Sequence, residues 1–392
     1  MVLELVAIAC IAAVAYTYIG YPFVAGALAI AAQASRDAAY IFGKRDRRVR
    51  APQEWPHVAV VISAFNEERH IGRRIENLLG LDYPADRLHV YIGSDGSTDA
   101  TPQILAQCRD PRVIALSFDA NRGKATVLND LVGRTREPIV VFSDANTFFD
   151  AQAVRHLVSR FNDPAVGAVS GELRLIGVAG DNQDSLYWRL EQYLKFCESR
   201  VGALLGANGA IYAIRRPLWQ PLRADTICDD FCVAMSVAAA GHRLAYEPAA
   251  WAEEESPPSI EDEHRRRVRI GIGNFQALVR HPEYLFRTSA ATAFAYLSHK
   301  VLRWLAPHLL LCGLAASLVL AVGSSAWLVF AALQLLAYVG AALLYVATGR
   351  GHMLAPALRL PAFLFALHWA FLIASLRYAA GRYAGSWGRT SR

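Results

Sequence analysis

The feature of this sequence that most constrains its fold is a long uncharged stretch near its start. No Asp, Glu, Lys or Arg occurs from Leu5 to Ala32. A helix of about 20 apolar residues, rising about 1.5 Å per residue, crosses a hydrocarbon layer of about 30 Å. We therefore expect a membrane-spanning helix here, kinked near Gly20 and Pro22.

The charges around this stretch indicate its orientation. A cleaved signal peptide would begin with basic residues, whereas the only early charge is Glu4. The basic cluster KRDRRVR, residues 44–50, follows the stretch instead. Because basic residues stay on the cytoplasmic side, we expect the N-terminus outside and the following residues, after the linker APQEWP, in the cytoplasm.

The last part of the chain returns to membrane-like composition. An amphipathic segment, AATAFAYLSHKVLRW, precedes two apolar segments, Leu305–Val322 and Ala326–Val346, which are long enough to span. A final segment, Leu354–Tyr378, carries Arg359, Pro361, His368 and Arg377, so it either barely crosses the bilayer or lies in its interface. We divide the chain into residues 1–50, 51–284 and 285–392.

The net charge of +6 does not indicate nucleic-acid binding. The basic residues gather beside the apolar segments and near the motifs below, and no nucleic-acid module is recognisable. Membrane lipid headgroups are the expected anionic partners.

Residues 51–284 alternate between apolar runs and helical patterns. The runs HVAVVISAF, LHVYIGS, RVIALSF, IVVFSD and VGAVSGEL are typical of strands, and spacers such as Glu67–Leu79 and Lys124–Arg134 have helical spacing. Strands this apolar are covered on both faces, as in a mainly parallel α/β sheet. Three polar motifs, SAFNEE, GSDGSTD and SDANT, each follow such a strand. We therefore expect them to meet at the edge formed by the carboxyl ends of the strands.

The ordered motifs resemble those of the family 2 glycosyltransferases. The similarity begins with VVISAFNEERHIGRRIENLLGLDYPADRLHVYIGSDGSTDAT and continues through NRGKATVLND, FSDANT, GANGAIYAIRR, ICDDF and RRRVRIGIGNFQ, covering residues 58–276. With flanking spans, the chain is most similar to membrane-bound synthases of cellulose, chitin, hyaluronan or poly-N-acetylglucosamine. The resemblance implies a GT-A fold and a UDP-sugar donor.

The resemblance also assigns nucleotide-binding residues. Ala64, Phe65, Glu67 and Asp95 match positions that hold the uridine base and ribose in the family, and Lys124 is in reach of the nucleotide.

Asp144 and Asn146 match the family's Asp-x-Asp pair, which binds Mg²⁺ or Mn²⁺ through the diphosphate. Oxygen ligands suit these hard cations. The second acid is an amide here, so one negative charge is lost and we expect weaker metal binding or a further ligand. The alternative is that Asp144 merely caps a following helix.

ICDDF places two carboxylates side by side at the start of a helical pattern. Like charges this close oppose joint ionisation and raise the pKa of one of them. By resemblance, Asp230 is the general base and Asp229 its neighbour. The alternative is a pair of acids that only stabilises a helix N-terminus.

The family's Gln-x-x-Arg-Trp signature falls on Arg266–Ile270. Arg269 keeps the arginine, Arg266 replaces the glutamine and Ile270 replaces the tryptophan. Arginines suit a departing diphosphate, but the aromatic platform for the acceptor sugar is lost, which puts processivity in doubt. A solvated basic face is the alternative.

The C-terminal SWGRTSR resembles the gating loop of hyaluronan and chitin synthases, which places Trp387 over the nucleotide on the cytoplasmic side. That topology needs Leu354–Tyr378 to lie in the interface. A tail without function is the alternative.

Together these observations predict a multi-pass enzyme of the inner (plasma) membrane with a cytoplasmic GT-A domain. It transfers sugar from a UDP-sugar to a growing polysaccharide, with polysaccharide-export or accessory subunits as candidate partners. The alternatives are transfer of one sugar to a membrane lipid, as in ceramide glucosyltransferase-like enzymes, and an inactive membrane scaffold.

Overall fold

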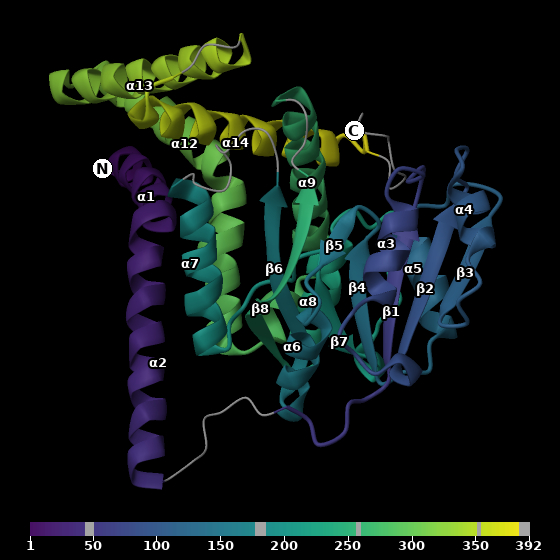
Figure 1. The fold of residues 1–392 in the computed structure, drawn as a ribbon. Coiled ribbons are helices and arrows are strands. Elements are labelled where there is room, and N and C mark those ends of the chain that lie inside the picture. The colour runs from purple at the N-terminus through teal and green to yellow at the C-terminus, as the bar shows by residue number, and fades with distance from the viewer. Residues whose placement is uncertain (44–50, 177–185, 256–259, 351–353, 384–392) are drawn as a thin grey trace.

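The protein is described by a computed structural model covering residues 1–43, 51–176, 186–255, 260–350 and 354–383. An eight-stranded sheet with helices on both faces lies beside a group of long helices (Figure 1). The strand order is β3-β2-β1-β4-β7-β6-β8-β5.

One half of the sheet is parallel and contains four of the five expected strands. These are β1 (Val58–Ala64), β2 (Leu88–Asp95), β3 (Val113–Phe118) and β4 (Ile139–Asp144). Ala64 pairs with Ser94, and Ser63 with Asp144, so the strands end at nearly the same level. The predicted meeting of the three motifs at one edge is confirmed.

The other half of the sheet is mixed. It contains β5 (Thr147–Phe149), β6 (Val166–Ile176), β7 (Tyr212–Arg215) and β8 (Arg243–Glu255). β6 and β8 are parallel, β7 runs antiparallel between β4 and β6, and β5 runs antiparallel to β8. The expectation of a mainly parallel sheet therefore holds for the half of the sheet that carries the motifs. In the other half, antiparallel strands can pair without a helical crossover between them.

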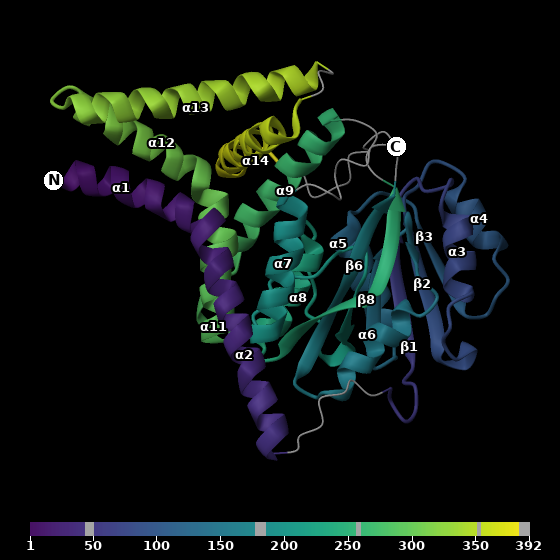
Figure 2. The ribbon, with the colours of Figure 1, turned by 60° about the vertical axis from the view of Figure 1, so that its left-hand side comes forward.

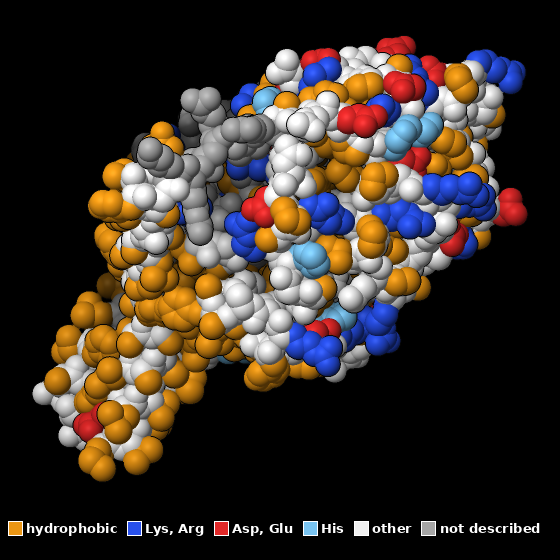
Figure 3. Space-filling view, turned by 90° about the horizontal axis from the view of Figure 1, so that it is seen from below, with side chains coloured by type: hydrophobic (Ala, Val, Ile, Leu, Met, Phe, Trp, Pro, Cys, Tyr) orange, Lys and Arg blue, Asp and Glu red, His pale blue; other side chains and the backbone are white. Residues whose placement is uncertain are grey.

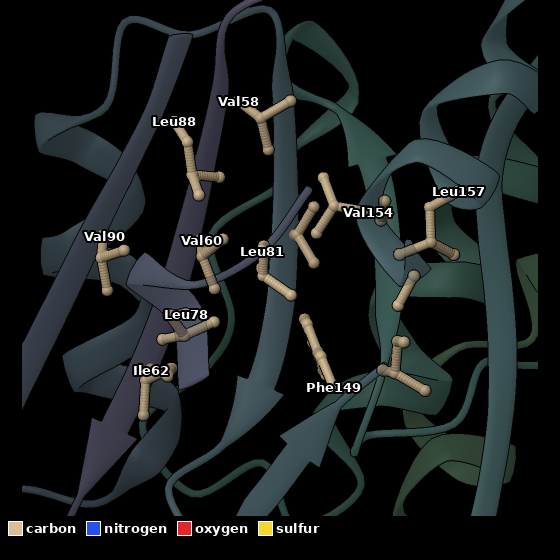
Figure 4. Packing of buried hydrophobic residues seen from close by; sticks show 14 of the residues in the cluster. Val58, Val60, Ile62, Leu78, Leu81, Leu88, Val90, Phe149, Val154 and Leu157 are labelled. Carbon is tan, nitrogen blue, oxygen red and sulfur yellow. The ribbon is translucent and has the colours of Figure 1, made fainter. Parts of the chain in front are cut away.

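Helices cover both faces of the sheet, as the apolar strands predicted. On one face, α3 (Ile71–Leu79), α4 (Thr101–Gln107) and α6 (Ala153–Ser159) bury apolar side chains in one cluster with the sheet, and α6 packs on β6 and β8. Figure 4 shows Leu78 beside Val60 and Ile62, and Val154 and Leu157 further along the same buried layer. On the other face lie α5 (Lys124–Arg134) and α8 (Asp229–Ala239). Short 3₁₀ turns occupy Ala85–Arg87, Arg160–Asn162 and Arg216–Leu218.

Four helical segments of the described chain are long and apolar enough to cross a membrane: Val2–Gly43, Ala290–Ala321, Ser325–Gly349 and Ala357–Ala379. The first comprises α1 (Val2–Ala15), a π-helical turn (Tyr16–Gly20) and α2 (Tyr21–Gly43). The helix changes direction at this turn (Figure 2), confirming the predicted kink. The second comprises α11 (Ala290–Ala295), a π-helical turn (Tyr296–Val301) and α12 (Leu302–Ala321). Exposed hydrophobic side chains cover the part of the molecule that these long helices form, which projects at the lower left of Figure 3.

The last two long helices are α13 (Ser325–Gly349) and α14 (Pro356–Ala379). In Figure 2, α13 runs across the view while α14 is seen nearly end-on, so α14 lies across the direction of α13. α14 packs on α9 (Ile260–Arg280), where a Cβ at Gly271 would lie 2.7 Å from the Ala374 Cβ. The short α10 (Glu283–Phe286) follows α9.

A buried polar cluster joins the long helices to α7 (Leu186–Val201). The Glu198 carboxylate accepts a hydrogen bond from Tyr21 Oη at 2.9 Å and contacts His299 Nδ1 at 2.6 Å. Glu191 pairs with Arg303, and its other carboxylate oxygen lies 3.5 Å from the Lys300 Nζ. Two carboxylates of α7 thus contact basic side chains of the second long helical segment.

Candidate active site

The loops after β1 and β2 are locked together by side-chain hydrogen bonds. Asn66 adopts a positive φ of 55°, and its Oδ1 accepts a hydrogen bond from the Thr98 backbone N at 2.8 Å. The Asn66 N donates to Ser97 Oγ at 3.1 Å, and the Glu67 N donates to Thr101 Oγ1 at 2.9 Å. Asn tolerates the left-handed region better than most residues because its side chain bonds locally. The first two motifs therefore form one rigid unit.

Three of the sequence-predicted nucleotide ligands lie in this unit. Ala64 is the buried last residue of β1, and Phe65 is half-buried beside it. The Glu67 carboxylate lies 3.0 Å from His70 Nδ1. Their contact with a nucleotide stays a prediction.

Asp95 is fully buried at the end of β2 and holds the loop that precedes α5. Its Oδ1 accepts a hydrogen bond from the Arg122 N, and its Oδ2 accepts one from the Gly123 N, each at 2.8 Å. Gly123 has a φ of 87°, which favours glycine. Direct contact of Asp95 with the nucleotide stays a prediction. In this structure Asp95 fixes Gly123, the residue directly before α5 begins at Lys124.

Lys124 lies at the centre of the site. Its Nζ is 2.9 Å from Asp144 Oδ1 and 3.2 Å from Asp229 Oδ2. Although burial opposes the charged form, the carboxylates of Asp144 and Asp229 raise the pKa of Lys124 above its usual value. The NRGK and ICDDF motifs are thereby joined to the end of β4.

Asp230 lies beside this ion pair in the first turn of α8. Its Oδ2 accepts a hydrogen bond from the Gly209 N at 2.9 Å, and its Oδ1 accepts one from the Phe231 N at 2.8 Å. Burial and the neighbouring Asp229 charge raise the pKa of Asp230 to about 6. A carboxylate with such a pKa is suited to accept a proton near neutral pH.

Arg74 is a site residue that the sequence did not single out. It is fully buried in α3, donates from Nη2 to Ser143 Oγ at 2.8 Å, and stacks on the Phe149 ring at 4.2 Å. Burial lowers the pKa of Arg74 to about 9, and the Asp144 charge opposes that change. The positive charge thus lies beneath the SDANT motif. The only signal in the sequence was an arginine on the apolar face of a short helix.

Asn146 follows β4 but caps no helix, because β5 comes next. This excludes the alternative that Asp144 exists to cap a following helix. Asn146 is buried, and its Nδ2 donates to Glu254 Oε1 of β8 at 3.0 Å. Glu254 was not predicted, because a run of three glutamates does not suggest a buried strand.

The donor set fits a hard cation that is completed by phosphate oxygens. No group of three or more His, Cys, Asp or Glu side chains within the described ranges could hold a metal ion alone. However, the Asp144 side chain is partly exposed, and Asp229 Oδ2 is buried with the Lys124 Nζ 3.2 Å away. Mg²⁺ typically uses one or two carboxylates and takes its remaining ligands from substrate phosphates and water.

Of the two predicted arginines of α9, Arg269 lies near this group. Arg266 is exposed and lies 3.9 Å from Glu263 of its own helix. Arg269 is half-buried, and its charge acts on the thiol of Cys228, the residue before Asp229. The Ile270 carbonyl oxygen accepts a hydrogen bond from the Cys228 Sγ at 3.6 Å. α9 is therefore docked on the start of α8. Trp387 lies outside the described residues.

Comparison with known proteins gives consistent matches. Residues 59–228 match the family model described as Glycosyl transferase family 2. A poly-beta-1,6-N-acetyl-D-glucosamine synthase of Staphylococcus aureus is 26% identical over 234 residues, which are 57% of this chain and 56% of that protein. The chain thus spans little more than half the length of that relative. A beta-monoglucosyldiacylglycerol synthase of Synechocystis sp. is 37% identical over 119 residues, 29% of this chain and 25% of that protein.

Among solved structures, a mannosyltransferase from Pyrobaculum calidifontis, in complex with GDP-Man and Mn²⁺, superposes with a TM-score of 0.70 at 24% identity. The match covers 97% of this chain and 100% of that one. At this identity it shows the fold, and it confirms the expected GT-A architecture with attached long helices.

Proposed function

This chain carries a family 2 glycosyltransferase domain, and we propose that it transfers a sugar from a nucleoside-diphosphate sugar to an acceptor hydroxyl at a membrane surface, with inversion at the sugar carbon. The observation that carries the proposal is the ion-paired group at the sheet edge. Lys124 lies between Asp144 and Asp229, and Asp230, with its raised pKa, lies next to them.

The residues divide the chemistry between them. Asp230 accepts the proton of the acceptor hydroxyl as its oxygen forms a bond to the sugar carbon. The bond from that carbon to the diphosphate breaks, and the electron pair leaves on the nucleoside diphosphate. Lys124 and Arg269 supply positive charge for the leaving group. Asp144 and Asn146 would hold Mg²⁺ or Mn²⁺, which neutralises the diphosphate when bound.

For the acceptor, we propose a growing polysaccharide. The matches to poly-beta-1,6-N-acetyl-D-glucosamine synthases support this choice, since they extend over 234 residues. On this basis polysaccharide-export or accessory subunits are its expected partners.

A membrane lipid that receives a single sugar is the second candidate acceptor. Two observations favour it. In the described part of α13, Ala331 is the one residue fully covered by the rest of the protein, so this helix does not close a channel within one chain. The 37% identical segment also belongs to a lipid glucosyltransferase by name.

We place the catalytic domain on the cytoplasmic side of the inner (plasma) membrane. The orientation follows from the basic cluster at residues 44–50. The direction of α14, across that of α13, supports an interfacial position for this helix.

The test is a donor and acceptor panel with purified full-length protein in lipid nanodiscs. UDP-glucose, UDP-N-acetylglucosamine and GDP-mannose are supplied separately, because the relatives differ in nucleotide and sugar. Products are weighed by mass spectrometry, with Asp230→Asn as the inactive control. A ladder of sugar units supports the polysaccharide, and one unit added to a lipid supports the second candidate. Absence of transfer and of nucleoside-diphosphate release with every donor would refute the proposed function.

A further inference from the structure

Asn146, which stands in place of the second acid of the Asp-x-Asp pair, is an amide hydrogen-bonded to a carboxylate of β8, the strand next to the edge of the sheet. Asn146 follows β4, whereas Glu254 is the penultimate residue of β8. The pairing of Thr147 with Glu254 brings them together, and Asn146 Nδ2 donates to Glu254 Oε1 at 3.0 Å. Both side chains are nearly covered, at 7% and 8% exposure.

We propose that Glu254 is a positioning residue for the divalent cation, replacing through Asn146 the negative charge that the motif lacks. This inference rests on the proposed function, because it concerns the cation of the same site.

The orientation of the amide supplies the first argument. An asparagine has one acceptor end and one donor end, and the donor end faces Glu254. Its Oδ1 is therefore directed away from the carboxylate, and oxygen is the ligand that Mg²⁺ and Mn²⁺ prefer. Without Glu254 the amide would be free to turn its nitrogen toward the cation. Partners of metal ligands commonly fix ligand orientation in this way.

Charge supplies the second argument. A hydrogen bond to a carboxylate polarises the amide and increases the negative character of its oxygen. The Glu254 charge also acts on the cation through a protein interior, where screening is weaker than in water. Glu254 thus brings a carboxylate group beside the amide that stands in place of the second acid of the motif.

The inference is tested by cation affinity without turnover. Full-length protein in nanodiscs is titrated with MnCl₂ in the presence of UDP, and separately of GDP, and free Mn²⁺ is followed by electron paramagnetic resonance. Glu254→Gln keeps an acceptor for the amide but removes the charge. We expect the Mn²⁺ Kd to rise on the order of tenfold, because a tenfold change corresponds to the same interaction energy as a shift of about one pKa unit. Glu255→Gln, at an exposed position of the same strand, is the matched control and should leave the Kd unchanged.

A double variant distinguishes loss of the Asn146–Glu254 interaction from a general effect on folding. In Asn146→Asp with Glu254→Gln, the charge is transposed and the new glutamine can donate to the new aspartate. The Mn²⁺ Kd should return to within about threefold of that of the unchanged protein. An unchanged Kd in Glu254→Gln, or no recovery in the double variant, would overturn the inference. So would failure of the unchanged protein to bind Mn²⁺, whereas the proposed function is judged separately by sugar transfer.

Discussion

The pKa of Asp230 leads to a quantitative prediction for the pH dependence of transfer. A general base works only when ionised, so kcat/KM should rise with pH through the pKa of the free enzyme. With a pKa of about 6, Asp230 is about one-tenth ionised at pH 5 and nine-tenths at pH 7. We expect kcat/KM at pH 5 to be about one-tenth of its plateau value. An ordinary aspartate, with a pKa of about 3.9, would still be mostly ionised at pH 5 and would cause little loss.

The causes of the raised pKa of Asp230 predict the direction in which a substitution of Asp229 will shift it. Burial is the largest cause, and the charge of Asp229 is the next. Asp229→Asn removes that charge, so the pKa of Asp230 should fall and the midpoint of the profile should move to lower pH. Asp230→Asn should lower kcat by about a hundredfold or more, while nucleotide binding persists.

The assay measures nucleoside-diphosphate release at saturating and limiting donor from pH 5 to pH 9, with a three-component buffer of constant ionic strength. Unfolding midpoints are compared, because an asparagine at 230 must place its nitrogen against one of two backbone N–H donors, those of Gly209 and Phe231. A profile that is flat between pH 5 and pH 7, or a midpoint that does not move in Asp229→Asn, would refute this reasoning.

Four further predictions concern the same site and the C-terminal tail. Gly209→Ala should lower kcat about tenfold, because its Cβ would lie 3.1 Å from Asp230 Oδ2, whereas Gly133→Ala, with no atom within 4 Å, should not; equal activities would contradict this. Chelation of divalent cations should abolish transfer and added Mn²⁺ or Mg²⁺ should restore it; full activity in chelator would mean that Lys124 and the arginines suffice. Deleting residues 386–392 should reduce transfer far more than protein abundance. A single cysteine placed after Arg392, in a background without the native cysteines, should resist an impermeant thiol reagent in intact cells; labelling would show that α14 spans the membrane.

Much of the catalytic edge could be predicted because its signals are local in the sequence. β1, β2 and β4 are short apolar runs ending in polar motifs, and the carboxyl ends of parallel strands meet by geometry alone. The contact of Lys124 with both Asp144 and Asp229 agrees with that expectation. No pattern, however, fixed the order of the strands or the antiparallel insertion of β7, because register depends on partners distant in sequence.

The missed residues are polar groups whose burial is decided by tertiary contacts. Helical spacing places Arg74 on the apolar face of a nine-residue helix, but the charge of an arginine argues against full burial, so the spacing alone did not mark it. β8 contains Pro248 and ends in three glutamates, which weakens any strand prediction. Glu254 is buried in a strand that pairs with β5 on one side and β6 on the other.

The polar cluster between α2, α7 and the second π-helical turn also sets an order for biosynthesis. Tyr21 leaves the ribosome 177 positions before its partner Glu198, and Glu198 precedes His299 by a further 101. Throughout translation of the intervening domain, the first long helical segment therefore lacks its final neighbours. A nascent chain that ends at residue 289 leaves Glu191 without Arg303 and Glu198 without His299. A chain that ends at residue 321 contains both partners. We expect the shorter chain to be degraded faster in pulse-chase experiments, and equal lifetimes would show that the cluster has no part in assembly.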